Sequence, residues 1–218
     1  LMAPMMQLQG DILLMLGRFD QATEIFDTAS NAAKNAKLPV VYSEILGSQA
    51  DIAMKQGQTD KALSAHKEAL EVQVELGDAK GAARTYNNMG YLYRRKNDRT
   101  KALEAYSEVE AIISSDESLL GAQIILGRAL LDLGEVERAR KHAFEAFERT
   151  DKADDMLAHA RAQALRGRYH AKMCDAETSM HHYTESLNIM SDVGDPVSMV
   201  ELMILLGEVL EDSGRSEE

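Results

Sequence analysis

Residues 87–106 read NNMGYLYRRKNDRTKALEAY, and this stretch decides the fold. Counting from the preceding tyrosine, four residues recur at i, i+3, i+4 and i+7, namely Tyr86, Met89, Gly90 and Tyr93. That spacing places all four on one stripe of an α-helix. A polar segment follows, after which Ala102 and Tyr106 are again one helical turn apart. The stretch therefore predicts two amphipathic helices joined by a polar turn.

A small residue recurs at the same point of the first helix along the whole chain, at Gly10, Ala50, Gly90, Gly127, Gly167 and Gly207. The gaps between them are 40, 40, 37, 40 and 40 residues. We expect the small residue to let the paired helices approach closely. An aromatic of the second helix, such as Tyr106, fills the space beside it, and His66 takes that place in the second unit. A fixed period of this length is typical of stacked repeats and not of a single folded core.

The period divides the sequence into a single array over residues 1–218. Its repeats lie at about 2–38, 39–77, 78–115, 116–153 and 154–194, with a final half repeat at 195–214. Turn chemistry supports this division, because Gly77-Asp78 and Gly194-Asp195-Pro196 are typical of a helix end followed by a new helix start. We expect four further side-chain caps before second helices, at Asp20, Thr59, Asp98 and Asp175. Eleven helices result, and the abrupt start at a leucine predicts a fragment of a longer chain.

These residues resemble the tetratricopeptide repeat, whose pattern has Leu-Gly, an aromatic, a turn glycine, an alanine, an aromatic and a second alanine. The resemblance covers nearly the whole chain. The units exceed the usual repeat of about 34 residues by about a turn and a half of helix, which resembles the long-helix subclass of about 40 residues. The resemblance implies an all-α fold, an α-α superhelix whose first helices line a concave groove for a peptide or partner protein.

The resemblance also indicates which positions face the groove. In the first, second and sixth units these positions are acidic, at Asp11, Glu44, Asp51, Glu201, Glu208 and Glu211. In the third, fourth and fifth units they are basic or polar, at Arg84, Asn87, Tyr91, Arg94, Arg128, Arg161 and Arg168. Arginine can hold a carboxylate through two N–H bonds. We therefore predict that this second set binds a peptide, with an acidic segment as the best match, although arginines also populate any solvated helix face.

Charge and composition exclude several other partners. The formal net charge of −12 argues against nucleic acid and anionic membrane, since both attract basic surfaces. The most apolar stretch, residues 119–134, is interrupted by Arg128 and Asp132 and is not expected to span a bilayer. The single cysteine, Cys174, excludes an internal disulfide and fits a reducing compartment, so a cytoplasmic location is expected.

One cluster has side chains that could bind a metal, formed by His170, Cys174, His181 and His182. The first two are four residues apart on a helix, a spacing that can chelate zinc. However, His170 takes a packing position and Cys174 replaces the turn glycine, so we expect structural roles. The sequence contains no glycine-rich phosphate loop, nucleophile elbow or HExxH motif. We predict a protein with no catalytic residues, no metal and no cofactor.

The predicted function is that of a non-catalytic interaction scaffold. Two alternatives stay open: a peptide-sensing regulatory domain of a bacterial-type transcription regulator, and a regulatory segment attached to a catalytic domain outside this sequence. Methionines crowd the first helix, at Met2 and Met5, and recur in the last, at Met199 and Met203. We expect these terminal helices to expose apolar faces that could associate end to end.

Overall fold

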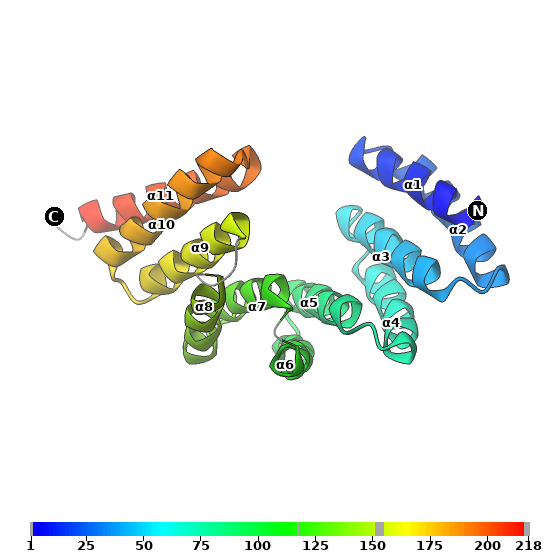
Figure 1. Ribbon diagram of the computed structural model, residues 1–218, viewed down its shortest axis with the longest axis horizontal. Helices are drawn as coiled ribbons and strands as arrows, with labels where there is room; N and C mark the ends of the chain where they lie inside the picture. The colour runs from blue at the N-terminus through cyan, green and yellow to red at the C-terminus, as the bar shows by residue number, and fades with distance from the viewer. Residues whose placement is uncertain (1, 117, 151–154, 216–218) are drawn as a thin grey trace. The chain divides into compact units, whose positions relative to one another are not determined.

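The computed structural model describes residues 2–116, 118–150 and 155–215. These residues form eleven α-helices and no strand (Figure 1). The helices are α1 (Met2–Met15), α2 (Phe19–Asn35), α3 (Pro39–Lys55), α4 (Thr59–Leu76), α5 (Ala79–Arg95), α6 (Arg99–Ser115), α7 (Leu120–Asp132), α8 (Val136–Thr150), α9 (Met156–Lys172), α10 (Ala176–Val193) and α11 (Pro196–Arg215). The all-α prediction is confirmed. The predicted boundary at residues 153 and 154 lies outside the described residues.

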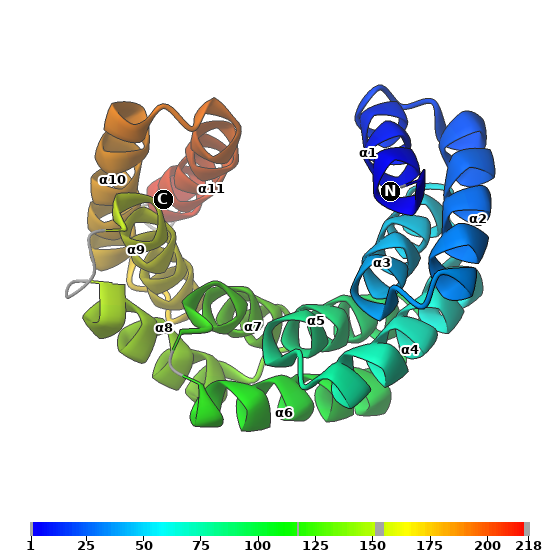
Figure 2. The same ribbon diagram turned by 45° about the vertical axis from the view of Figure 1, so that its right-hand side comes forward.

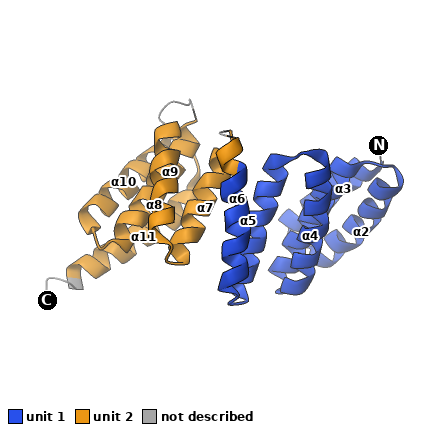
Figure 3. Cartoon of the chain, turned by 90° about the horizontal axis from the view of Figure 1, so that it is seen from below, with its two compact units in different colours: residues 1–112 blue, residues 113–218 orange. Residues whose placement is uncertain are grey.

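The chain divides into two compact units, residues 1–112 and 113–218 (Figure 3). Within each unit, successive helices pair as antiparallel hairpins that stack in two layers. In unit 1 the helices α1, α3 and α5 form one layer and their partners form the other (Figure 2). In unit 2 the helices α7, α9 and α11 form one layer, and α8 and α10 form the other (Figure 2). The first helices of the repeats therefore share one face in each unit.

Four of the small residues lie against large side chains, as the repeat pattern predicts, whereas a Cβ atom at Gly207 would have no neighbour within 4 Å. A buried ring of the second helix covers the glycine of the first in three repeats: Phe26 on Gly10, Tyr106 on Gly90 and Tyr183 on Gly167. A Cβ atom at Gly10 would lie 2.6 Å from the Phe26 ring, so a larger side chain would force the helices apart. Gly127 differs, because its nearest neighbour is Leu165 of the following repeat.

Helix starts follow the predicted caps in most repeats. An aspartate side chain accepts a hydrogen bond from the backbone N–H three residues ahead at Asp78, Asp98, Asp155, Asp175 and Asp195. The prediction is wrong for Asp20 and Thr59, which lie inside the first turns of α2 and α4. Those helices begin two residues after Gly17 and Gly57, and their N-cap residues provide no side-chain hydrogen bond.

Candidate functional site

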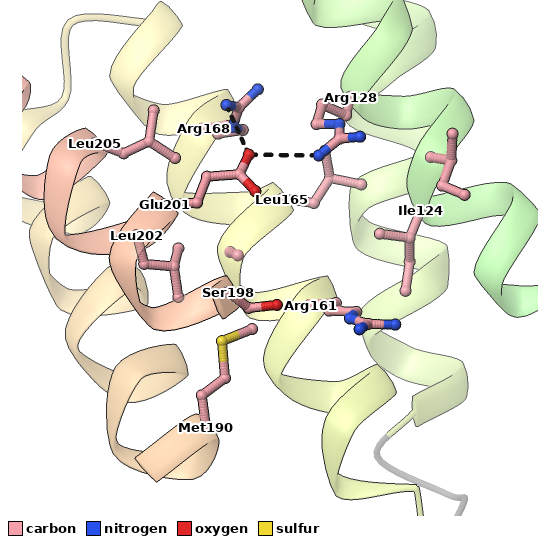
Figure 4. A pocket seen from close by; sticks show the side chains of 12 residues that line it. Ile124, Arg128, Arg161, Leu165, Arg168, Met190, Ser198, Glu201, Leu202 and Leu205 are labelled. Carbon is pink, nitrogen blue, oxygen red and sulfur yellow. Dashed lines mark hydrogen bonds and ion pairs between the residues drawn. The ribbon is translucent and has the colours of Figure 1, made fainter. Parts of the chain in front are cut away.

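Three of the predicted groove arginines meet at one cavity of unit 2. Arg128 of α7 and Arg161 and Arg168 of α9 line a cavity of about 280 Å³ (Figure 4). Much of the remaining lining is apolar and includes Ile124, Leu165, Met190, Leu202 and Leu205. Leu165 and Leu202 are buried, so packing against neighbouring helices fixes this part of the wall. The site therefore combines an apolar floor with guanidinium groups from two adjacent first helices.

A carboxylate from α11 already lies between two of these arginines. Glu201 Oε1 is 3.4 Å from Arg128 Nη1 and 3.5 Å from Arg168 Nη2 (Figure 4). Both contacts are long for charge-assisted hydrogen bonds, which are usually about 2.7–2.9 Å. Arg168 also lies 3.8 Å from Asp132 Oδ1. The two guanidinium groups thus converge on a single carboxylate that the chain itself supplies.

Arg161 contacts the cap of α11. Its Nη2 lies 3.5 Å from Asp195 Oδ2. The pKa of Asp195 is lowered chiefly by the hydrogen bonds from the Ser198 side chain and backbone, and the nearby Arg161 adds to this. The side chains of Arg161 and Arg128 are 52% and 48% exposed, so both guanidinium groups remain accessible to a ligand.

The other predicted groove residues belong to α5 of unit 1. Arg84 is exposed and lines a separate cavity, which three carboxylates also line. Tyr91 is 38% exposed, and its ring centroid lies 5.5 Å from Arg94 Cζ. Asn87 is only 5% exposed, so little of its side chain is available at a surface. Its assignment to the groove stays a prediction.

The cluster of histidines and cysteine has structural contacts. His170 Nδ1 lies 3.1 Å from Asp175 Oδ2, and the buried His182 Nδ1 lies 2.8 Å from Gln163 Oε1. Cys174 is exposed and has a φ of 57°, the left-handed turn conformation predicted from its replacement of glycine. In the part of the chain that the structure describes, no group of three or more His, Cys, Asp or Glu has a metal-binding arrangement.

None of the described helices combines the length and apolar character needed to cross a bilayer. Two tetratricopeptide repeat family models match the chain, one over residues 42–115 and the other over residues 120–143.

Several solved structures share the fold at low sequence identity. BtubC (BKLC) from P. vanneervenii has a TM-score of 0.71 and is 16% identical, covering 87% of this chain and 80% of that chain. A signal transduction ATPase with a tetratricopeptide repeat sensor from Pyrococcus horikoshii has a TM-score of 0.73 and is 15% identical. The match covers 91% of this chain and 31% of that chain. A Rap protein complexed with Competence and Sporulation Factor has a TM-score of 0.63 and is 14% identical. The match covers 99% of this chain and 72% of that chain. These similarities establish the fold.

A curated relative is the outer dynein arm-docking complex subunit 4 of Xenopus laevis. It is 22% identical over 135 residues, which make up 62% of this chain. The match spans only 24% of the relative's own length.

Proposed function

This chain belongs to the tetratricopeptide repeat proteins, and on that basis we propose that it binds an acidic segment of a peptide or partner protein in the groove formed by its first helices. The unit 2 cavity carries this proposal, because Arg128, Arg161 and Arg168 surround an apolar floor there. A bound segment would place a carboxylate between the guanidinium groups and an aliphatic side chain on the floor. The arginine fork favours carboxylates through paired N–H bonds.

The size of the cavity indicates that it holds only part of a longer ligand. Its volume of about 280 Å³ is just below the range for small-molecule sites, about 300–1,000 Å³. We infer that it takes one or two side chains of an extended segment, while the rest of the segment contacts the surrounding helices. Arg84, Asn87, Tyr91 and Arg94 of unit 1 remain predicted groove residues of their own unit.

Three further proposals complete this assignment. We propose a single array over residues 1–218, a cytoplasmic location and membership of the long-helix subclass. The helix lengths support the subclass, since α2, α3 and α5 have 17 residues each and α4 and α10 have 18.

Peptide sensing is a second candidate function. The similarity to the Rap protein solved with Competence and Sporulation Factor favours it. A sensor would bind a small free peptide and respond with a change in its own dimensions, which small-angle X-ray scattering with and without peptide would detect. The similarity to a signal transduction ATPase with a tetratricopeptide repeat sensor favours the third alternative, a regulatory segment joined to a catalytic domain.

A randomised hexapeptide array tests the proposed function. We expect the wild-type chain to select sequences rich in Asp and Glu with interspersed aliphatic residues. The double variant Arg128→Glu, Arg168→Glu should lose this selection, because the substitutions replace attraction with repulsion.

The matched control is Lys67→Glu, Lys141→Glu, which makes the same change of net charge at exposed positions on α4 and α8, in the other helix layer. The control should select the same peptides as the wild type. The proposal is wrong if the wild type shows no acidic preference, or if both double variants lose it equally.

A further inference from the structure

Unit 1 contains a second cavity, of about 300 Å³, that the proposed function does not use. It lies on the layer formed by α1, α3 and α5, which stand side by side in Figure 2. Three carboxylates line it, those of Asp11, Glu44 and Asp51. One guanidinium group, that of Arg84, lines it as well. The lining therefore carries more negative than positive charge.

The three carboxylates differ in how the protein holds them. Ser48 Oγ donates a hydrogen bond to Asp11 at 3.0 Å, and Gln7 Nε2 donates one to Glu44 at 3.0 Å. Asp51 is half-buried and has no hydrogen-bond or ion-pair partner among the residues that the structure describes. Burial raises the pKa of Asp51, and the positive charges of Arg84 and Lys55 oppose this effect only in part. A cation bound there would stabilise the charged form of Asp51.

His66 of α4 also lines this cavity. In the repeat pattern it replaces the aromatic that covers the first helix in other repeats, and it is 1% exposed. Neither of its ring nitrogens has a hydrogen-bond partner among the described residues, an uncommon state for a buried polar group. Burial, with a smaller contribution from Arg84, lowers the pKa of His66 to about 4. The ring is therefore neutral at pH 7 and adds no positive charge to the cavity.

We propose that this cavity binds a primary ammonium group, held by Asp51 with Asp11 and Glu44 beside the neutral ring of His66. An ammonium group has three N–H donors and no acceptor, which matches a lining of carboxylates and an imidazole acceptor. The lysine side chain of a bound segment and a free polyamine share this chemistry. The site goes beyond the proposed function, because it lies in the other unit and takes a ligand of the opposite charge.

Other ligand classes match the cavity less well. An anion would be repelled by the three carboxylates. A metal ion lacks a ligand set, since no metal-binding group of His, Cys, Asp or Glu occurs within residues 2–116. Arg84 opposes an ammonium group, and it is exposed and forms no ion pair with a described residue. Its removal should therefore strengthen binding without disturbing the core.

Titration of the ¹⁵N-labelled protein, followed by NMR, tests this proposal. The probes are spermidine and an acetylated, amidated hexapeptide of one lysine and five alanines, with the same peptide carrying norleucine as the uncharged control. We expect shifts at Gly47, Ser48 and Asp51, which lie on the wall of the cavity. Binding by one probe alone identifies the source of the ammonium group. Binding by neither probe, or equal binding of the norleucine peptide, overturns the proposal.

Three variants sharpen the test. Asp51→Asn should weaken spermidine binding about tenfold, the size expected when one charge-assisted hydrogen bond is lost. Arg84→Gln should strengthen it. His66→Phe restores the aromatic of the repeat pattern, so it should raise the melting temperature and weaken spermidine binding about threefold. An unchanged affinity in His66→Phe would show that His66 is only a core residue.

The unit 2 variant Arg128→Glu, Arg168→Glu separates this proposal from the proposed function. It should bind spermidine as tightly as the wild type, because both substitutions lie outside unit 1. Loss of acidic-peptide selection with retained spermidine binding supports both proposals. Equal spermidine affinity in Asp51→Asn and wild type would overturn the ammonium site alone.

Discussion

Glu201→Gln should strengthen the binding of acidic peptides to unit 2. The Glu201 carboxylate lies 3.4 Å and 3.5 Å from Arg128 and Arg168, where a ligand carboxylate would have to bind. The chain therefore supplies a competitor for its own site. Glutamine keeps the shape of the side chain but removes the charge, so the two guanidinium groups become available to the ligand.

The magnitude follows from the exposure of the groups. The Glu201 side chain is 54% exposed, and the Arg128 and Arg168 side chains are 48% and 23% exposed. Ion pairs at such exposure contribute about 0.2–1 kcal/mol each. Because both contacts are long and share one oxygen, we take about 0.5–1 kcal/mol for the two together. The affinity for an acidic hexapeptide should rise about two- to fivefold, since 1.4 kcal/mol corresponds to a factor of ten.

Fluorescence anisotropy with an array-selected acidic hexapeptide measures this change. The matched control is Glu208→Gln, which removes the same charge from the exposed face of α11 but leaves the arginine pair intact. Its affinity should rise less than that of Glu201→Gln, and high salt should reduce both effects. Equal gains in the two variants would mean that only net charge matters, and a weaker affinity in Glu201→Gln would refute the competition.

Other features of the structure give further predictions. Gly207→Ala should stabilise the protein by about 0.5–1 kcal/mol, because no atom lies within 4 Å of the new methyl group. Gly10→Ala should instead lower the melting temperature, because its methyl group would clash with a buried ring. The Ser198 hydrogen bonds lower the pKa of Asp195, so this cap stabilises the protein above the ordinary pKa of 3.8, and the stabilisation is lost as the pH falls below it. In urea unfolding, the free energy of unfolding of Asp195→Asn should therefore decrease less on acidification than that of the wild type. Met5 is 72% exposed on α1, so Met5→Lys should reduce any concentration-dependent association of the wild type in analytical ultracentrifugation; an unchanged association would exclude this face.

The sequence was sufficient to predict the helix pairs and much of their packing. The period of small residues locates the glycines that lie under Phe26 and Tyr183, since a fixed spacing on two helices also fixes which side chains meet. It also identified Cys174 as a substitute for a turn glycine. These features depend on residues close in sequence, so helical geometry is enough to predict them.

The details of both cavities depend on contacts between distant residues. Glu201 is 33 positions from Arg168 and 73 from Arg128, so its place between them follows from the packing of α11 and not from any local pattern. Asn87 was assigned to the groove by its position in the repeat, whereas its burial to 5% exposure depends on its neighbours in space. The departure of His66 from the repeat pattern was visible in the sequence, whereas its unpartnered ring nitrogens depend on its neighbours in space.

Chemical-shift mapping with the array-selected acidic hexapeptide tests the central claim most directly. We predict that the largest shifts occur at the cavity wall in α7, α9 and α11, including Arg128, Arg168 and Glu201 as its carboxylate is displaced. Shifts confined to α8 and α10, the other layer of unit 2, or no shifts in unit 2 at all, would contradict the claim that the three arginines form the binding site.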